Sequence, residues 1–195
     1  MRLFPTGIQL TKTEYTGLLH AVNDPEKWLS DLMVANADVN RIELINQWQA
    51  KLFNDPAVET LPAVKSELAS LIFARSDYKT RLQIDAALPK PEPVNRNSVF
   101  RYNRKARPDG DNVTLFPTGL DVADDDASCI LAYSQDLEDE VLGALLGQIN
   151  RGTKKMIAKY HPIILADSSV SITPASEAGL VEMIVARSDY QSLGG

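Results

Sequence analysis

Two copies of a five-residue motif, Ala-Arg-Ser-Asp-Tyr, bring together side chains that could bind an anion. The motif spans Ala74 to Tyr78 and recurs from Ala186 to Tyr190. An arginine presents a planar fork that matches a carboxylate or a phosphate, and a neighbouring Asp or Tyr could assist. Alternatively, the motif ends a helix, where Arg complements the negative end of the dipole and Tyr buries its ring. We favour the structural interpretation for the recurring residues Arg75, Asp77, Tyr78, Arg187, Asp189 and Tyr190.

Other residues with catalytic or ligand chemistry do not form a recognisable pattern. The acidic run Asp124-Asp125-Asp126 could hold a divalent cation, but it lacks the alternating ligands, the central Gly and the distal Glu of a calcium loop. The run equally suits the start of a helix. His20 and His161 stand apart, and no Ser or Cys is paired with a base by its spacing. The sequence therefore predicts no catalytic residue, no metal, no cofactor and no enzymatic activity.

A second motif, Leu-Phe-Pro-Thr-Gly, recurs at the same separation as the first. It begins at Leu3 and again at Leu115, 112 residues later (115 − 3). Its single glycine is too few for a phosphate cradle, so we expect a fixed turn that anchors the chain onto the helices. Aligning the chain with itself at this offset matches further identical residues, including Asp24/Asp136, Glu26/Glu138 and Asp55/Asp167. These repeats predict a tandem duplication.

Local signals predict the elements at the start of each repeat. The segments Leu3 to Leu10 and Leu115 to Val122 are expected to be extended around a Pro-Gly turn. A helix is predicted from Lys12 to Val22. Asp24-Pro25-Glu26 then combines a capping side chain, a proline suited to the first turn and an acid that favours the positive end of the dipole. The helix that starts there is predicted to be either bent or broken between Ala35 and Asn40.

The end of each repeat is predicted from prolines. Asp55-Pro56 and His161-Pro162 disfavour continuation of the long helices. A final helix is expected to begin at Pro62 in the first repeat and at Pro174 in the second. Thr173 is a suitable cap for the second of these helices.

Together these patterns predict a mainly α protein of two tandemly duplicated small helical domains. Each domain has a short extended N-terminal segment, and an extended basic linker joins them. The predicted boundaries are 1–82, 83–113 and 114–195. The 195 residues carry a net charge of −6, which argues against a nucleic-acid coat, and the single cysteine, Cys129, excludes an intrachain disulfide. No apolar run is long enough to cross a membrane, so we expect no membrane partner.

The linker combines prolines with a basic, aromatic-bearing arm. Lys90-Pro91-Glu92-Pro93 should be extended. Such an arm could bind single-stranded nucleic acid by charge and stacking, or dock on an acidic protein surface such as the stretch from Asp121 to Glu140. The acidic net charge favours a protein partner. The residues assigned to partner binding are Arg96, Phe100, Arg101, Tyr102, Arg104, Lys105 and Arg107.

The repeat unit resembles a type of short helical protein encoded in tailed-bacteriophage genomes, mostly uncharacterised. The resemblance is carried by Asp24-Pro25-Glu26-Lys27-Trp28, Asp55-Pro56, Pro62-Ala63 and Ala74 to Tyr78. The second repeat departs from it at Glu140, in the place of Trp28, and at Ser168, in the place of Pro56.

The resemblance implies a virion component, or a protein of the host cytoplasm if it is not incorporated. The predicted role is that of a non-enzymatic structural or adaptor protein of a head, neck or tail assembly, which engages other structural subunits. Two alternatives remain. One is a nucleic-acid-binding accessory protein that uses the linker, and the other is an acidic inhibitor of a host enzyme.

Overall fold

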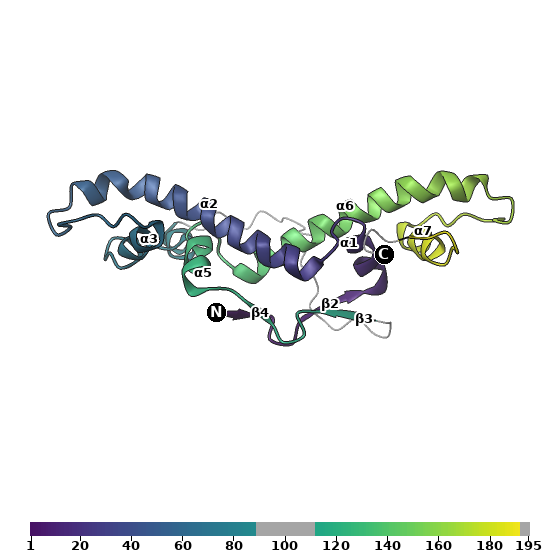
Figure 1. The fold of residues 1–195 in the computed structure, drawn as a ribbon, viewed down its shortest axis with the longest axis horizontal. Coiled ribbons are helices and arrows are strands. Elements are labelled where there is room, and N and C mark those ends of the chain that lie inside the picture. Colours follow the sequence, from purple (N-terminus) through teal and green to yellow (C-terminus); the bar gives the residue numbers. More distant parts are fainter. Residues whose placement is uncertain (89–111, 192–195) are drawn as a thin grey trace. The chain divides into compact units, whose positions relative to one another are not determined.

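The computed structural model describes residues 1–88 and 112–191, which form a mainly helical protein (Figure 1). Seven helices and four short strands lie within these residues. The predicted mainly helical class is therefore confirmed. The predicted partner-binding arm, from Arg96 to Arg107, lies outside the described residues.

Apart from α4, which has no counterpart among the described residues, the elements follow the same order in the two halves of the chain. The first half contains β1 (Arg2–Leu3), β2 (Ile8–Thr11), α1 (Lys12–Leu19), α2 (Pro25–Phe53), α3 (Lys65–Phe73) and α4 (Arg81–Ala87). The second half contains β3 (Asn112–Leu115), β4 (Leu120–Asp121), α5 (Asp124–Leu131), α6 (Leu137–Ala166) and α7 (Glu177–Val185). Helices α5, α6 and α7 each begin 112 residues after α1, α2 and α3 (124 − 12, 137 − 25, 177 − 65).

Both Leu-Phe-Pro-Thr-Gly motifs form the expected tight turn. The backbone N–H of Gly7 donates to the carbonyl of Phe4 at 2.7 Å, and that of Gly119 donates to Phe116 at 2.8 Å. Both phenylalanines have a positive φ, 48° at Phe4 and 49° at Phe116, a conformation that is uncommon outside glycine. The two turns therefore share a specific backbone geometry as well as a sequence.

The extended segments of the two halves pair with each other. Strand β2 runs antiparallel to β3, with Ile8 opposite Leu115 and Thr11 opposite Asn112, and β1 pairs with β4. Ile8 and Leu115 are buried, which places one face of this small sheet against the helices. Pairing across the halves was not predicted from the sequence.

Contacts divide the chain into two compact units, and each unit takes elements from both halves. The unit that we call the α2 unit comprises α2 from Leu32 onward together with α3, α4 and α5. The α6 unit comprises the described residues of 2–31, 112–120 and 138–191, and so includes α1, α6 and α7. Each compact unit therefore combines residues from both sides of the segment 83–113.

The core of the α6 unit forms where three helices meet. Met156, Tyr160 and Ile164 of α6 pack with Val181 and Ile184 of α7 in one buried cluster. Helix α1 crosses α6 at two glycines so closely that a Cβ at Gly152 would lie 1.7 Å from the carbonyl oxygen of Gly17. The absence of side chains at both positions permits this approach.

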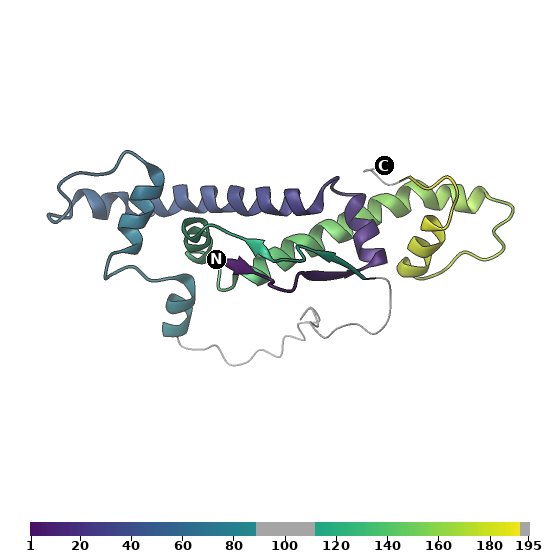
Figure 2. The same ribbon diagram turned by 60° about the horizontal axis from the view of Figure 1, so that its bottom comes forward.

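The core of the α2 unit lies between α2, α3 and α5. Leu44 and Leu52 of α2, Ile72 of α3 and Cys129 of α5 are almost completely buried. The chain turns back after both long helices, in the loops 54–64 and 167–176, so that α3 and α7 lie beside their C-terminal parts (Figure 2). Each last helix is thereby held against the long helix that precedes it.

The long helix of the first half is not broken. Helix α2 is continuous from Pro25 to Phe53, and Asp24 caps it by accepting from the backbone N–H of Lys27 at 2.9 Å. The predicted gap at 35–40 contains Ala37, which is fully buried. This small residue continues the buried face, so the broken alternative is wrong.

The predicted end of the second long helix and the predicted starts of both last helices are also wrong. Helix α6 continues through Pro162 to Ala166. Because Pro162 lies in the last turns, it removes one helical hydrogen bond, to the carbonyl of the exposed Ala158, which solvent can satisfy. Helices α3 and α7 begin at Lys65 and Glu177, each three residues later than expected, and the cap of α7 is Ser176, which accepts from Gly179.

Candidate functional site

The two Ala-Arg-Ser-Asp-Tyr motifs form the turns that directly follow α3 and α7. The backbone N–H of Arg75 donates to Ile72 at 3.1 Å, and that of Arg187 donates to Ile184 at the same distance. Tyr78 then donates to the carbonyl of Arg75 at 3.2 Å. The motif is therefore a hydrogen-bonded turn that fixes the backbone from which the arginine side chain extends.

In the α6 unit, Arg187 lies between two carboxylates. Its Nη1 donates to Oδ2 of Asp167 at 2.9 Å, and its Nε and Nη2 donate to the two oxygens of Asp189 at 2.8 and 3.1 Å. We call this group the C-terminal clasp (Asp167, Arg187 and Asp189). It joins the end of α6 to the turn after α7.

The α2 unit contains the same arrangement at the matching positions. Arg75 donates from Nη1 to Oδ2 of Asp55, and from Nε to Oδ1 of Asp77 at 2.9 Å. We call this group the N-terminal clasp (Asp55, Arg75 and Asp77). Lys51 adds a longer ion pair to Asp77 at 3.8 Å. Two carboxylates of the same chain therefore orient each guanidinium, so neither arginine presents an unoccupied fork.

Hydrogen bonds in the clasps shift the titration of their acids. Hydrogen bonds from the Ser169 hydroxyl, and then from Arg187 and the Ser169 backbone, lower the pKa of Asp167 to about 2. The backbone N–H of Ala57 and then Arg75 lower the pKa of Asp55. All these carboxylates are thus ionised in the native state near neutral pH, as the clasps require.

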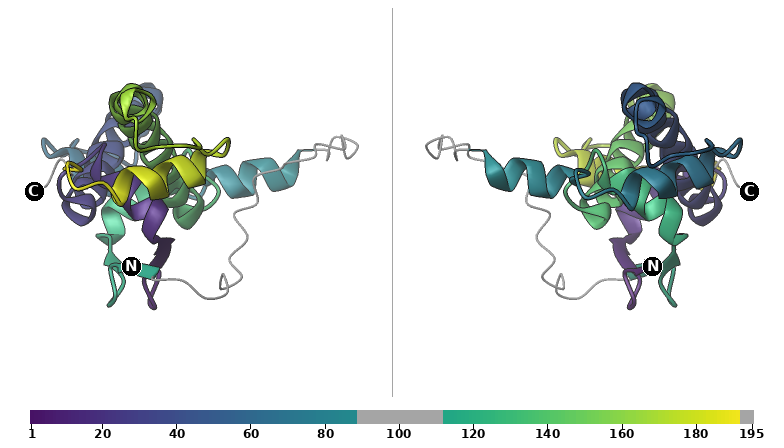
Figure 3. Two further views of the ribbon diagram at one scale, coloured as in Figure 1. Left: turned by 90° about the vertical axis from the view of Figure 1, so that its right-hand side faces the viewer. Right: turned by 90° about the vertical axis from the view of Figure 1, so that its left-hand side faces the viewer.

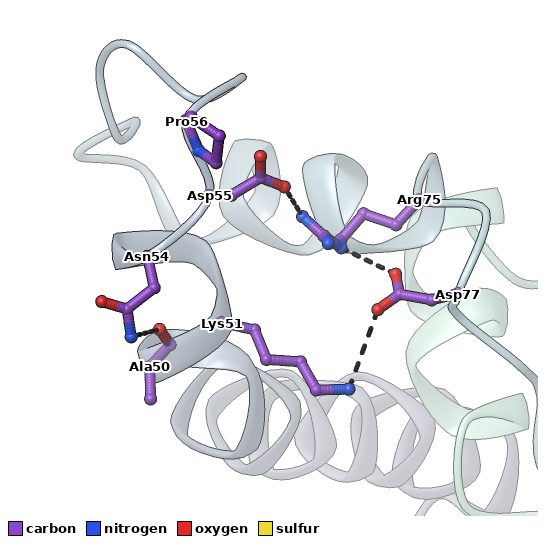
Figure 4. Close-up of a pocket in the computed structure, with 7 residues that line it drawn as sticks. All are labelled: Ala50, Lys51, Asn54, Asp55, Pro56, Arg75 and Asp77. Carbon is purple, nitrogen blue, oxygen red and sulfur yellow. Dashed lines mark hydrogen bonds and ion pairs between the residues drawn. The ribbon is translucent and has the colours of Figure 1, made fainter.

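A shallow open pocket of about 520 Å³ lies beside the N-terminal clasp. Figure 4 shows the charged side chains at its rim and the ion pairs that join them. Its lining residues are Ala50, Lys51, Asn54, Asp55, Pro56, Arg75 and Asp77. The charges at the rim are already paired, and its open form suits contact with a protein surface better than enclosure of a small molecule.

The motif tyrosines pack into aromatic clusters of different chemistry. Tyr78 packs edge-on against Phe73, with ring centroids 5.1 Å apart. Tyr190 lies against Tyr160 at 5.8 Å, and its hydroxyl lies 3.1 Å from Nε2 of the buried His20. The Tyr160 hydroxyl accepts from the backbone N–H of Gln191 at 3.0 Å. The α6 unit therefore contains a connected polar network at the place where the α2 unit has mainly packing contacts.

Among the described residues of the α2 unit, three buried side-chain polar atoms have no hydrogen-bond partner. These are Nε of Arg41 and the hydroxyls of Tyr78 and Tyr133. Arg41 is otherwise well paired, since its Nη2 donates to Asp126 at 2.5 Å. Burial raises the pKa of Tyr133 to about 12, with further contributions from Glu43 and the neighbouring hydroxyl and thiol groups.

The acidic run of the sequence forms the first turn of α5. Asp124 accepts from the amino group of Met1 at 2.7 Å, and Asp126 pairs with Arg41. Among residues 1–88 and 112–191, no group of three or more His, Cys, Asp or Glu side chains is placed to hold a metal ion. In the same residues, no helix is both long and apolar enough to cross a membrane.

No protein-family model, curated protein or solved structure matches this chain.

In the structure, most of the predicted motif residues form hydrogen bonds or ion pairs with residues that the sequence did not identify as their partners. Asp55 and Asp167 complete the clasps, and their only sequence signal was that they are identical at the offset shared by Arg75 and Arg187. The contact of His20 with Tyr190 had no such signal, because no histidine lies at the matching position in the other half.

Proposed function

We propose that the chain is a non-enzymatic structural or adaptor protein that carries two copies of one structural unit. In this proposal, each copy presents a docking surface at the end of its long helix. The two surfaces engage equivalent sites on a symmetric assembly of partner subunits. A tailed-phage particle, in its head, neck or tail, is the context that the sequence resemblance implies.

The observation that carries this proposal is the recurrence of the clasp. Asp55–Arg75 and Asp167–Arg187 connect the same donor and acceptor atoms, 112 residues apart (167 − 55). Both pairs tie the end of a long helix to the turn after the following helix. In each clasp the two carboxylates bind the arginine between them, so the end of the long helix and the turn beside it keep a fixed shape. A surface that is already in its bound shape loses less entropy on binding.

An exposed apolar side chain stands beside each clasp at matching positions. Phe53, at the end of α2, is 67% exposed, and Leu165, at the end of α6, is 64% exposed. Each lies two residues before the clasp carboxylate, Asp55 or Asp167. Large apolar side chains next to well-ordered polar groups are typical anchors of protein interfaces.

Two such anchors on one chain favour a repeated partner. When the first surface has bound, the second binding event becomes intramolecular, and the avidity can exceed either single affinity by about 10²–10⁴-fold. Symmetric assemblies present equivalent sites at fixed spacing.

The test is to follow the protein through infection by a phage that encodes it. Particles purified by density gradient should contain the chain in a stoichiometric amount, measured by quantitative mass spectrometry. A chain found only in the cleared lysate would contradict the virion role.

Variants then test whether the two anchors act together. Phe53→Ser and Leu165→Ser should each reduce incorporation, and the double variant should abolish it. Val39→Ser is the matched control, since Val39 is 63% exposed on α2 but has the basic Arg151 at its matching position. Equal loss with the control variant would show that the anchors have no special role.

A further inference from the structure

The exposed face of α6 carries a strip of positive charge. Arg151, Lys154, Lys155 and Lys159 are all exposed. No Asp or Glu occurs from Val141 to Ala166, so no acid interrupts the strip along the helix. We call these four residues the α6 basic strip.

The spacing of the strip places its side chains on one side of the helix. They stand at positions i, i+3, i+4 and i+8, which share a helix face. Gly152, Met156 and Tyr160 are buried on the opposite face. Within the α6 unit, α1 and α7 cover that opposite face, while the other side of α6 is open (Figure 3). At a rise of about 1.5 Å per residue, the strip extends about 12 Å along the axis.

Some exposed cations of the chain have an acidic partner, which the strip cations do not have among the described residues. Lys27 pairs with Asp31 at 2.7 Å, and Arg81 pairs with Asp85 at 2.9 Å. None of the ion pairs found within the described part of the chain includes a residue of the α6 basic strip. The Nζ of Lys159 lies 5.0 Å from the centroid of the Tyr160 ring, and this contact with an aromatic face does not neutralise its charge.

The other long helix does not share this feature. The residues of α2 that match the strip are Val39, Ile42, Glu43 and Gln47. The strip is therefore not required by the common backbone pattern of α2 and α6, since α2 forms the same kind of helix without it. Four like charges on one helix face repel each other, which an anionic partner would relieve.

We propose that the α6 basic strip binds the phosphate backbone of a nucleic acid. A duplex carries phosphates about every 3.4 Å of axis on each strand, so a 12 Å strip can contact about three or four of them. Protein interface cores are instead depleted in lysine and contain apolar anchors. From Gly143 to Lys159 the exposed side of α6 contains no large apolar side chain. The strip ends six residues before Leu165 (165 − 159), the anchor of the docking surface on the same helix.

The test is a titration of labelled short duplex DNA with the full chain, followed by fluorescence anisotropy at several salt concentrations. The triple variant R151A/K154A/K155A should bind at least tenfold more weakly than the wild type. Its slope of log affinity against log salt should be shallower by roughly 2 to 3, because each phosphate contact contributes about 0.9. The charge-retaining variant R151K/K154R/K155R should bind like the wild type. This result would show that the three positions tolerate substitution when the positive charge is kept.

Three results would overturn the proposal. The first is that the full chain does not bind duplex DNA at low salt. The second is that the triple variant retains the wild-type affinity and slope, or that the control K27A/K65A/K79A, at exposed lysines outside the strip, loses as much as the triple variant. The third is that polyglutamate competes as well as DNA at equal charge, which would make the strip a docking surface for acidic proteins. Success or failure here is independent of particle incorporation.

Discussion

Arg187 donates a hydrogen bond to Asp167 across 20 positions of sequence, at 2.9 Å, and thereby ties the end of α6 to the turn after α7. Both side chains are mostly covered by their surroundings, with 18% and 28% of their surface exposed. The neighbouring hydroxyl of Ser169 also donates to Asp167, at 2.6 Å. The carboxylate is thus held in its charged form by donors from two segments, which makes the clasp sensitive to acid.

The first prediction is that Asp167 contributes to acid unfolding. Its native pKa of about 2 lies below its ordinary value of 3.8, so its stabilising effect is complete above about pH 4 and is lost as the pH falls towards 2. Asp167→Asn should lower the urea midpoint at pH 7 and flatten its decline between pH 4 and 2. The exposed loop variant Glu59→Gln should leave the curve unchanged. Parallel curves for D167N and the wild type would contradict the prediction.

The second prediction concerns the crossing of α1 and α6. A Cβ at Gly152 would lie 1.7 Å from a backbone oxygen of Gly17, so Gly152→Ala must force the helices apart. We expect a loss of about 3 kcal/mol or more in the free energy of unfolding, at the upper end of overpacking effects. Gly147→Ala, where a Cβ meets nothing within 4 Å, should stabilise by about 0.5–1 kcal/mol through helix propensity. Chemical denaturation measures both, and similar effects for the two variants would refute the close crossing.

Local signals explain what could be predicted from the sequence. Asp24-Pro25-Glu26 starts α2 correctly because capping, proline geometry and the dipole all act within one turn. The prediction at Pro162 failed because the cost of a proline depends on whether the exposed carbonyl can reach water, which a local pattern does not contain. The prediction at Pro62 placed the start of α3 three residues too early. The residue that precedes the helix is Val64, whose side chain cannot cap it, so the sequence contains no capping signal at the true start.

Interactions between distant segments could not be predicted in the same way. The extended segments at Ile8 and Leu115 have similar sequences, so the pattern does not say whether each packs with its own half or with the other. For the two clasps, the sequence contained part of the necessary information. Asp55 and Asp167 recur at the same offset as Arg75 and Arg187, but recurrence does not specify which acid an arginine contacts.

The third prediction separates tyrosines with and without hydrogen-bond partners. The buried hydroxyl of Tyr133 has no partner in the structure, so Tyr133→Phe should be neutral or stabilise by up to about 1 kcal/mol. Tyr160→Phe removes an acceptor used by Gln191 and should cost about 0.5–1.5 kcal/mol. Thermal and urea unfolding of the two variants provide the comparison. A larger loss for Y133F than for Y160F would contradict the assignment.

Alkaline pH gives an independent test of the same residue. The pKa of Tyr133 is raised from 10 to about 12, so its contribution to stability is complete below pH 10 and is lost as the pH rises towards 12. Tyr133→Phe should therefore reduce the alkaline decline of the unfolding midpoint in this range. If the decline persists unchanged in Y133F, another group causes it.

The last prediction is that His20 makes the α6 unit sensitive to mild acid. Burial, and then the positive charge of Lys159, lower the pKa of His20 below its ordinary value of 6.5. The neutral ring is the native form, so its contribution is complete above pH 6.5 and is lost as the pH falls further, by at most about 1.4 kcal/mol per pH unit. His20→Gln keeps a polar group near Tyr190 without this titration and should flatten the unfolding curve below pH 6.5. Lys159→Gln removes the repulsion and should raise the pKa of His20 in an NMR titration. His161→Gln is the matched control, and flattening by H161Q instead of H20Q would transfer the effect to the other histidine.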